Sequence, residues 1–568
     1  MIKQYFIAFE DSAICSTIWF GTSSKKILIL PSVALRSMAG IRYYTSILAS
    51  SLNKLGYNVI TFDYPGTGNS EGDIVSVGIM EMLNASEKVF DFIEEKFESP
   101  IDFVIGLAAG NMIAPMLQRR KKINQTILLN PDFDCIHGFY EGMDNGINDK
   151  YMDSTSLGYF ESDFTTDNGS DATFTVLNME NPSYEVRFWD ALIGPFYGGE
   201  SEIVSYKLVQ ELRKVNIIGD LSDFQDQTVV FYWGNWFPDS QLTSQCVDMQ
   251  YIDCGRLTNE NYWVESSQLF DQTIKIVCDY LEVPVLAEEF NKEAVMERLE
   301  KYTKYELNDN VFVQTFSIIT RGKSMVGLLY GPSTDSDSVR PIVIYEHGLC
   351  CDNVGEYRAW YILSCELARK GYYSLRYDHI GSGVSGGEFD ETSYDNYVND
   401  LKSLINWCKD INLKSNGKII MISWSFGANI SLMMASNEPR IDRIILWSPV
   451  IENGTATTKI KFYRNNNGNI VFPISPLWLP SEFLISEKAL DMKSINSQVV
   501  QPTLLVTGEK DNEVLYQPFV EKIANRVCDT HVMIRNAGHC FSMHTIKTVI
   551  GYTISWIEGE ERRNDLFD

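Results

Sequence analysis

The chain has 568 residues, 45% of them hydrophobic, which is enough for two ordinary hydrophobic cores and too much for one. A formal net charge of -27 and a pI near 4.7 argue against a nucleic-acid partner, because contact with phosphates requires a basic face. The 11 cysteines lack paired CxxC spacing, which indicates reduced thiols in a cytoplasmic protein rather than disulfides or a zinc site.

The N-terminal residues do not resemble a targeting segment. Glu10 and Asp11 interrupt the chain before the apolar core of a signal peptide develops. No later run reaches the roughly 18 uncharged apolar residues that a membrane helix needs. We therefore expect neither a signal peptide nor membrane insertion.

Short apolar runs alternate with helical stretches through the first half of the chain. KKILILPS, from Lys25, is followed by RYYTSILASSLNKLGY and then by GYNVITFDYPGTGNSEGD, from Gly56. The run FVIG and a tight turn, LAAGNMIA, come next and contain Ala108. Strands that alternate with helices of this length predict an α/β fold with a mostly parallel sheet and helices on both faces.

Residues 284–302 connect this half to the next. Phe290, Val295, Leu299 and Tyr302 recur at helical spacing with charged residues between them. The pattern predicts an ordered helical linker rather than a flexible tether. We therefore expect the N-terminal domain to pack on the C-terminal one.

The same order of elements returns in the second half. RPIVIYEHG, from Arg340, precedes a helical stretch, and GYYSLRYDHIGSGVSGGE begins at Gly371, 315 residues after Gly56. The apolar run GKIIM then leads to ISWSFGANI, in which Ser425 follows Ala108 by 317 residues. This internal repeat predicts two domains, residues 1–283 and 303–568, of related architecture.

The turn around Ser425 carries chemistry that its counterpart lacks. A serine between small residues at a sharp strand-to-helix turn has its Oγ exposed at the carboxyl end of the sheet. In this turn the first small residue is Ser423 instead of the usual glycine. The pattern predicts a nucleophile at Ser425 and none at Ala108.

Both halves resemble α/β-hydrolase domains. The loops FDYPGTGNSEG and YDHIGSGVSGG are similar to the D-x-x-G-x-G-x-S segment of bacterial serine hydrolases of the monoglyceride-lipase, serine-aminopeptidase and exosortase-associated groups, and of natural-product thioesterases. The resemblance covers roughly residues 1–283 and 303–560 and implies tandem α/β-hydrolase domains, each with a cap insertion. It specifies the fold more strongly than the substrate.

The resemblance also implies a catalytic triad, whose members follow in the order serine, acid, histidine. Asp511, after the apolar run QPTLLVTG, resembles the acid position, and Glu452 is the alternative acid. His539, in RNAGHC, resembles the histidine position. The imidazole would take the proton of Ser425, and the acid would orient the imidazole.

Two backbone N–H groups are expected to form the oxyanion hole of this site. One belongs to Phe426, directly after the nucleophile, and the other to Leu349 in EHGLCCDN, which resembles the family's His-Gly-x-x signature. The resemblance makes His347 an anchor of this loop rather than a base. Cys350 and Cys351 are interpreted as bystanders, because no cysteine occupies the turn of the nucleophile.

The first half lacks the same chemistry. Ala108 stands at the nucleophile position, Phe237 at the acid position with Asp239 close by, and Arg256 at the histidine position. The single histidine of this half, His137, follows the sixth predicted strand instead. We expect a catalytically inactive domain with a structural or binding role.

Each half is expected to carry an insertion. In the first half, roughly residues 135–225 are rich in aromatic residues, which suit either a core or the recognition of a partner. In the second, Pro473, Pro476 and Pro480 in VFPISPLWLPSEFLI predict irregular structure rather than a helix or a central strand. We expect this cap, roughly residues 451–499, either to wall an acyl pocket or to pack on the sheet edge. The candidate substrate-binding residues are Leu477, Trp478, Leu479 and Phe483.

The sequence thus predicts a serine hydrolase that cleaves a small-molecule ester or thioester, free or carrier-bound, through an acyl-enzyme. This chemistry requires no metal and no organic cofactor. An acyltransferase that uses the same triad is an alternative. A non-catalytic ligand-binding protein on the same fold is another, and covalent labelling by a serine-directed phosphonate would separate it from an enzyme.

Overall fold

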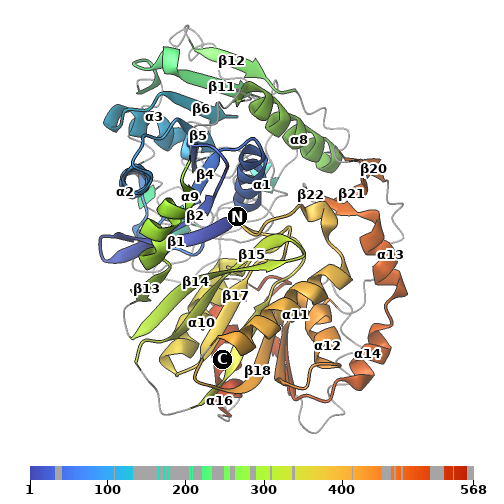
Figure 1. Cartoon of the computed structure of the whole chain (residues 1–568). Helices are drawn as coiled ribbons and strands as arrows, with labels where there is room; N and C mark the ends of the chain where they lie inside the picture. Colours follow the sequence, from blue (N-terminus) through green and yellow to red (C-terminus); the bar gives the residue numbers. More distant parts are fainter. Residues whose placement is uncertain are drawn as a thin grey trace. The chain divides into compact units, whose positions relative to one another are not determined.

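The computed structural model describes the chain in two compact units (Figure 1). One unit comprises Met1–Thr303 with Pro473–Leu477, and the other comprises Lys304–Phe472 with Trp478–Asp568. The described residues are 1–31, 41–107, 109–131, 220–232, 249–255, 262–281, 290–307, 310–334, 339–411, 413–450, 462–465, 468–474, 477–511, 530–541 and 543–559, with short pieces between 164 and 211.

The first unit is built on a mixed sheet in the order β1-β2-β4-β3-β5-β6-β11-β12. The pairs β1–β2 and β2–β4 are antiparallel, and the remaining pairs are parallel. Its strands are β1 (Ile2–Phe9), β2 (Ser12–Trp19), β3 (Lys26–Leu30), β4 (Asn58–Phe62), β5 (Phe103–Leu107), β6 (Gln125–Leu129), β11 (Thr228–Tyr232) and β12 (Gln250–Asp253). Short strands elsewhere are β7 (Phe164–Thr165), β8 (Asp171–Ala172), β9 (Val176–Leu177) and β10 (Val204–Ser205).

Helices flank this sheet, and the last of them comes from the segment that leads to the second unit. Phe290 stacks on Phe97 with ring centroids 6.0 Å apart, and Arg298 donates a hydrogen bond to the carbonyl of Lys96 at 2.8 Å. Residues 290–302 are therefore ordered against helix α2 (Ile79–Phe97) of the first unit. The helices are α1 (Ile41–Lys54), α2 (Ile79–Phe97), α3 (Gly110–Arg120), α8 (Tyr262–Leu281) and α9 (Lys292–Leu299), with 3-10 turns at Ile74–Ser76, Gln225–Gln227 and Glu300–Tyr302.

The second unit has the same strand order with one extra edge strand, β13-β14-β15-β17-β16-β18-β19-β23-β24. Strands β13 to β15 and the pair β15–β17 are antiparallel, and the pairs from β17 onward are parallel. The strands are β13 (Lys304–Leu307), β14 (Val311–Thr320), β15 (Lys323–Pro332), β16 (Arg340–Glu346), β17 (Tyr373–Tyr377), β18 (Ser415–Trp424), β19 (Ile441–Trp447), β23 (Thr503–Gly508) and β24 (Thr530–Ile534). Both sheets are mostly parallel, as the alternation of strands and helices predicts.

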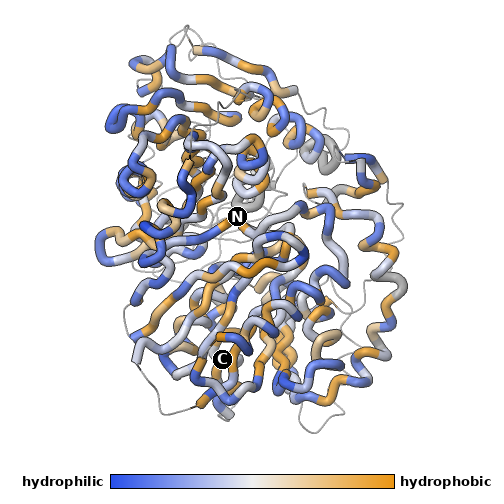
Figure 2. The backbone as a smooth tube through the Cα atoms, in the orientation of Figure 1, coloured by the Kyte–Doolittle hydropathy of each residue, from blue (hydrophilic) through white to orange (hydrophobic). Residues whose placement is uncertain are grey.

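The helices of the second unit pack in pairs, α10 with α16 and α11 with α12. Because helices cover the sheet, its central strands are nearly continuous apolar runs, and Figure 2 shows hydrophobic stretches along them. Val343 and Ile344 of β16 are fully buried. The helices are α10 (Ala359–Arg369), α11 (Tyr394–Asp410), α12 (Gly427–Ala435), α13 (Ser481–Ala489), α14 (Met492–Gln498) and α16 (Met543–Glu558), with 3-10 turns at Glu356–Arg358 and Phe389–Glu391.

The cap segment is more regular than its prolines predict. A small sheet in the order β20-β21-β22 precedes helix α13, so the expectation of irregular structure is wrong. Pro473 is compatible with this sheet because β21 pairs with β20 through Ile470 and Val471, before the proline. Pro480 ends β22 directly before the helix. The strands are β20 (Tyr463–Arg464), β21 (Ile470–Ile474) and β22 (Leu477–Pro480).

The glycine-rich loop after β4 and the one after β17 have the same internal geometry. Asp63 and Asp378 each accept a hydrogen bond from the N–H six residues later, at 2.8 and 3.0 Å. Each also accepts, at its backbone carbonyl, the serine hydroxyl seven residues later, at 2.5 and 2.7 Å. Gly68 and Gly383 have φ of 49° and 50°, and a Cβ on either would stand 2.2 Å from the aspartate carboxyl carbon. The repeated sequence thus forms repeated structure.

Within the part of the chain that the structure describes, no helix has the length and apolar character needed to cross a membrane.

Candidate active site

The candidate nucleophile lies between β18 and α12. Ser425 has a φ of 52°, in the left-handed region that non-glycine residues seldom adopt. Its N–H donates to the carbonyl of Trp447 at 2.9 Å, and its own carbonyl accepts the N–H of Val450 at 3.1 Å. These bonds to the neighbouring strand β19 and the loop after it hold the strained turn in place.

Two small residues around Ser425 allow the turn to pack closely. A Cβ on Gly427 would stand 2.5 Å from the carbonyl oxygen of Glu346, so only glycine fits there without a shift of the backbone. Ser423, which replaces the usual glycine on the other side, is fully buried, and its hydroxyl lies 2.5 Å from that of Ser431 on α12. This partner explains how a polar residue is accommodated beneath the turn.

The structure brings Ser425, His539 and Asp511 together in one hydrogen-bonded chain. His539 Nε2 lies 2.9 Å from Ser425 Oγ, and His539 Nδ1 lies 2.9 Å from Asp511 Oδ2. A carboxylate can only accept, so Nδ1 carries the proton and Nε2 faces the hydroxyl as an acceptor. The Asp511 carboxylate is fully buried, and the imidazole is 10% exposed. The alternative acid, Glu452, lies outside the described residues.

The three side chains follow the carboxyl ends of three parallel strands of one sheet. Ser425 follows β18, Asp511 follows β23 and His539 follows β24. Trp424, the last residue of β18, stacks on the imidazole of His539 with ring centroids 6.1 Å apart and donates its indole N–H to the backbone carbonyl of His539 at 3.4 Å. Sequence analysis did not single out Trp424, because an apolar residue at the end of a buried strand is expected whether or not it supports a histidine.

The two N–H groups expected to form the oxyanion hole lie on segments next to Ser425. Phe426 precedes the first turn of α12, where backbone N–H groups point away from the helix. Gly348, directly before Leu349, is so close that a Cβ on it would stand 3.2 Å from Cβ of Ser425. Among the described residues, neither the N–H of Leu349 nor that of Phe426 has a hydrogen-bond acceptor.

The thiols beside this loop are protonated. Burial raises the pKa of Cys350 and of Cys351 well above the ordinary value of a thiol. Neither is therefore poised to act as a nucleophile. Among the described residues, no group of three His, Cys, Asp or Glu side chains could hold a metal ion.

The candidate substrate-binding residues fall in the cap. Phe483, on α13, lies with its ring centroid 5.4 Å from that of Phe426 and 5.3 Å from that of Tyr394. Trp478 is buried and packs on Tyr463, with ring centroids 6.1 Å apart. Leu477 and Leu479 are buried in β22. The structure thus places Phe483 against the residue after the nucleophile and the other three within the cap, and it adds Tyr394, which the sequence did not single out.

The corresponding turn of the first unit is described only in part. A Cβ on Gly110, at the start of α3, would stand 2.0 Å from the carbonyl oxygen of Leu30, the same kind of close approach as at Gly427. The prediction that the first half is inactive depends on residues that lie outside the described part of the chain. They are Ala108, His137, Phe237, Asp239 and Arg256.

The comparisons with known proteins concern the second unit most directly. Residues 337–478 match the family model of the serine aminopeptidases, S33, a range that includes Ser425 and ends before Asp511 and His539. No curated protein is matched by the sequence.

Many solved structures are similar to part of the chain. Est1E from Butyrivibrio proteoclasticus, solved with ferulic acid bound, is 18% identical, and the match covers 43% of this chain and 98% of that one with a TM-score of 0.37. The α/β hydrolase GrgF from Penicillium sp. sh18 is 16% identical over 44% of this chain and 98% of its own, with a TM-score of 0.35. The esterase domain of a Rhodothermus marinus protein is 17% identical over 43% and 97%, with a TM-score of 0.34.

Three observations point to the same fold: the strand order, the strained turn at Ser425 and the family match. The chain is an α/β-hydrolase fold protein.

Proposed function

We propose that the protein is a serine hydrolase that cleaves a carboxylic ester or thioester through an acyl-enzyme on Ser425. The observation that carries this proposal is the chain of hydrogen bonds from Ser425 Oγ through His539 to Asp511, at 2.9 Å each. Serine is a poor nucleophile by itself and requires such a base within hydrogen-bond reach.

This geometry supports the following reaction. Ser425 Oγ attacks the acyl carbon while His539 Nε2 takes its proton, and Asp511 stabilises the imidazolium that forms. The N–H groups of Leu349 and Phe426 donate hydrogen bonds to the oxygen of the tetrahedral intermediate and stabilise its negative charge. His539 then protonates the departing alcohol or thiol, and a water activated by the same imidazole releases the acid.

We infer that the first unit is an inactive copy of the same domain. The shared strand order and the matching glycine-rich loops support a duplication, and Ala108 in place of the serine supports the loss of activity. The small-molecule substrate therefore binds in the second unit, beside Phe483 of the cap.

Hydrolysis of p-nitrophenyl butyrate by the full chain tests the proposal. Ser425→Ala and His539→Ala are each expected to lower kcat by at least roughly 10³-fold. The double variant should be little worse than either single one, because triad members act as a unit. Hydrolysis that persists in Ser425→Ala at the wild-type rate would contradict the proposal.

A further inference from the structure

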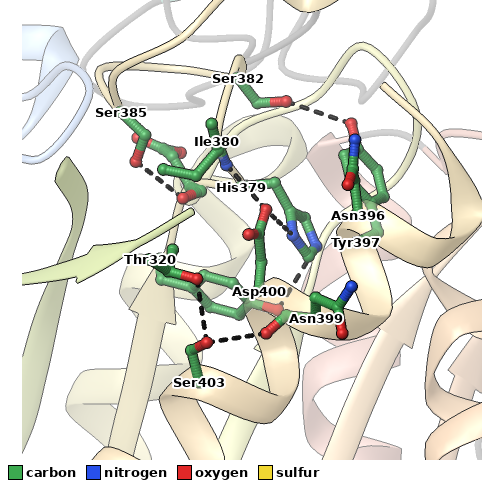
Figure 3. A network of polar contacts seen from close by, with 12 residues as sticks. Thr320, His379, Ile380, Ser382, Ser385, Asn396, Tyr397, Asn399, Asp400 and Ser403 are labelled. Atoms are coloured by element: carbon green, nitrogen blue, oxygen red, sulfur yellow. Dashed lines mark hydrogen bonds and ion pairs between the residues drawn. The ribbon is translucent and has the colours of Figure 1, made fainter. Parts of the chain in front are cut away.

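Four charged side chains gather beneath the loops of the active site, and the proposed mechanism uses none of them. Glu346 ends β16, His379 follows β17, Asp400 lies in α11, and Arg321 lies in the turn between β14 and β15. The side chains of Glu346, His379 and Asp400 are fully buried. We call these four residues the buried ionic cluster, part of which is shown in Figure 3.

The cluster is paired at every position. His379 Nε2 lies 2.5 Å from Glu346 Oε1, and His379 Nδ1 lies 3.4 Å from Asp400 Oδ2, too long for a strong hydrogen bond but close enough for an ion pair. Tyr377 donates its hydroxyl to Glu346 Oε2 at 2.6 Å. Arg321 donates two hydrogen bonds to the Asp400 carboxylate, at 3.0 and 3.1 Å. Two carboxylates thus face two cationic side chains.

The pairing keeps His379 charged at neutral pH. Burial alone would lower the pKa of His379, but the carboxylates of Glu346 and Asp400 outweigh it and raise the pKa to about 9. Burial would raise the pKa of Asp400, yet the close charge of His379 and the hydrogen bonds from Arg321 hold this pKa below its ordinary value. The cluster is therefore an imidazolium between two carboxylates.

One arm of the cluster reaches the oxyanion-hole loop through His347. Its Nδ1 lies 2.8 Å from the carbonyl oxygen of Gly348, and its Nε2 lies 3.3 Å from the backbone N–H of His379. The carbonyl only accepts and the N–H only donates, so both neighbours require the same tautomer, with the proton on Nδ1. Burial and the charge on His379 lower the pKa of His347 to about 3, which keeps this ring neutral.

This tautomer determines where the N–H of Leu349 points. In a trans peptide the carbonyl and the following N–H point in opposite directions. Because His347 holds the carbonyl of Gly348 on the inner side, the N–H of Leu349 is directed to the other side of the loop. Gly348 itself lies against Ser425.

A second arm reaches Phe426. The ring of His379 stacks on Tyr397 with centroids 3.9 Å apart and planes 7° apart, as expected for a cation over an aromatic face. Tyr397 in turn packs edge-on against Phe426, with centroids 5.6 Å apart. The backbone of Glu346 also packs closely on the start of α12, since its carbonyl oxygen lies 2.5 Å from where a Cβ of Gly427 would be.

We propose that the buried ionic cluster positions the oxyanion hole: Glu346 and His379 hold both N–H donors, that of Leu349 through His347 and that of Phe426 through Tyr397. The proposal rests on the proposed function, because it assigns a role within the same site. Glu346, His379 and Tyr377 are then positioning residues that do not touch the substrate.

Tyr377, the last residue of β17, and Tyr372, directly before that strand, offer a matched pair of variants. Tyr377→Phe removes a hydroxyl that donates to Glu346 at 2.6 Å at the active-site end of the strand. Tyr372→Phe removes a hydroxyl that donates to Glu558, also at 2.6 Å, at the opposite end. Both changes delete the same group from a buried ring, so they separate an effect on the oxyanion hole from a general loss of packing. His379→Gln, which removes the imidazolium itself, is the stronger variant.

The measurements are kcat and KM for p-nitrophenyl butyrate and the ratio of kcat for this ester to kcat for its thionoester. Sulfur accepts hydrogen bonds weakly, so this ratio reports the strength of the oxyanion hole. We expect Tyr377→Phe to lower kcat roughly 10-fold and His379→Gln roughly 100-fold, with KM within about twofold and the ratio reduced in parallel. Tyr372→Phe is expected to keep kcat and the ratio within about twofold of wild type.

The outcomes distinguish this proposal from the proposed function. A wild-type protein that does not hydrolyse the ester through Ser425 overturns both. An active wild type in which Tyr377→Phe matches Tyr372→Phe in kcat and in the ratio overturns the positioning role alone. A fall in kcat with an unchanged ratio of ester to thionoester turnover also overturns the positioning role, because the cluster would then act on stability or on the triad. If His379→Gln does not fold, Tyr377→Phe decides.

Discussion

The position of the Ser425 hydroxyl depends on the backbone hydrogen bonds of this residue and on the packing of the residues around it. The left-handed backbone of this residue is held by the carbonyl of Trp447, and its neighbour Gly427 allows α12 to approach β16. Beneath them, the hydroxyls of Ser423 and Ser431 satisfy each other in a fully buried place. At the scale of single residues, the turn is therefore specified by packing as much as by the motif.

The serine pair leads to a prediction about stability. Ser431→Ala should lower the free energy of unfolding by about 1–3 kcal/mol, because the buried hydroxyl of Ser423 loses its partner. The double variant Ser423→Ala, Ser431→Ala should be more stable than Ser431→Ala alone, since no polar group is then left unsatisfied. Urea unfolding measures both, with Ser436→Ala near the end of the same helix as the control. A double variant less stable than the single one would contradict the pairing.

Several elements meet at the buried ionic cluster, which links β16, β17, α11 and the turn before β15. The groups that face His379 are Glu346, Tyr377, Tyr397, Asp400 and the neutral His347. Arg321 acts on it only through Asp400. An imidazolium held by two carboxylates makes the stability of these elements depend on pH.

The sign of this dependence follows from the pKa of His379. The pKa is raised from 6.5 to about 9, so the folded state binds its proton more tightly than the unfolded state. The contribution, roughly 3 kcal/mol, is complete below about pH 6.5 and is lost as the pH rises through about 9. Urea unfolding at pH 6.5 and pH 9.5 should show a larger loss of stability in wild type than in His379→Gln. Equal losses in the two proteins would refute the assignment of the charge.

The cap elements carry a prediction about substrate. Phe483 of α13 packs against Phe426 next to the nucleophile, so among the described cap residues it is a candidate to contact an acyl chain. Each buried methylene contributes roughly 0.8 kcal/mol, so medium-chain esters should have a higher kcat/KM than acetyl esters. Phe483→Ala should reduce this preference more than it reduces acetyl turnover, and Trp478→Ala serves as the comparison within the cap. A chain-length profile that is flat from acetyl to decanoyl would exclude an acyl pocket.

Sequence analysis predicted the elements that a local pattern of apolar residues indicates. It missed the features that depend on packing between distant segments. The order of strands and helices follows from apolar periodicity, and Ser425, Asp511 and His539 stand at strand ends, where the fold gathers them. The cap strand β21 was missed because its pairing with β20, which stops before Pro473, depends on a partner strand and not on the local pattern. The cluster around His379 was missed because its members come from four separate elements and have no common spacing.

At the scale of the whole molecule, two sheets have the same strand order but carry different residues at the turn of the nucleophile. Both contain the aspartate-centred glycine loop and a glycine that admits the helix after the turn. In the second unit that turn ends in a serine with an imidazole in reach. In the first, the sequence has Ala108 and a single histidine, His137, which does not stand at the position of His539. The central claim is thus that one chain of 568 residues contains one hydrolase site.

Labelling of the full chain with a fluorophosphonate, followed by peptide mass spectrometry, tests this claim most directly. A phosphonate reacts with a serine that has been activated by a base, and the account predicts one adduct per chain, on Ser425, which disappears in Ser425→Ala and in His539→Ala. An adduct on a serine of residues 1–283, or a folded wild-type chain that takes up no label, would contradict it.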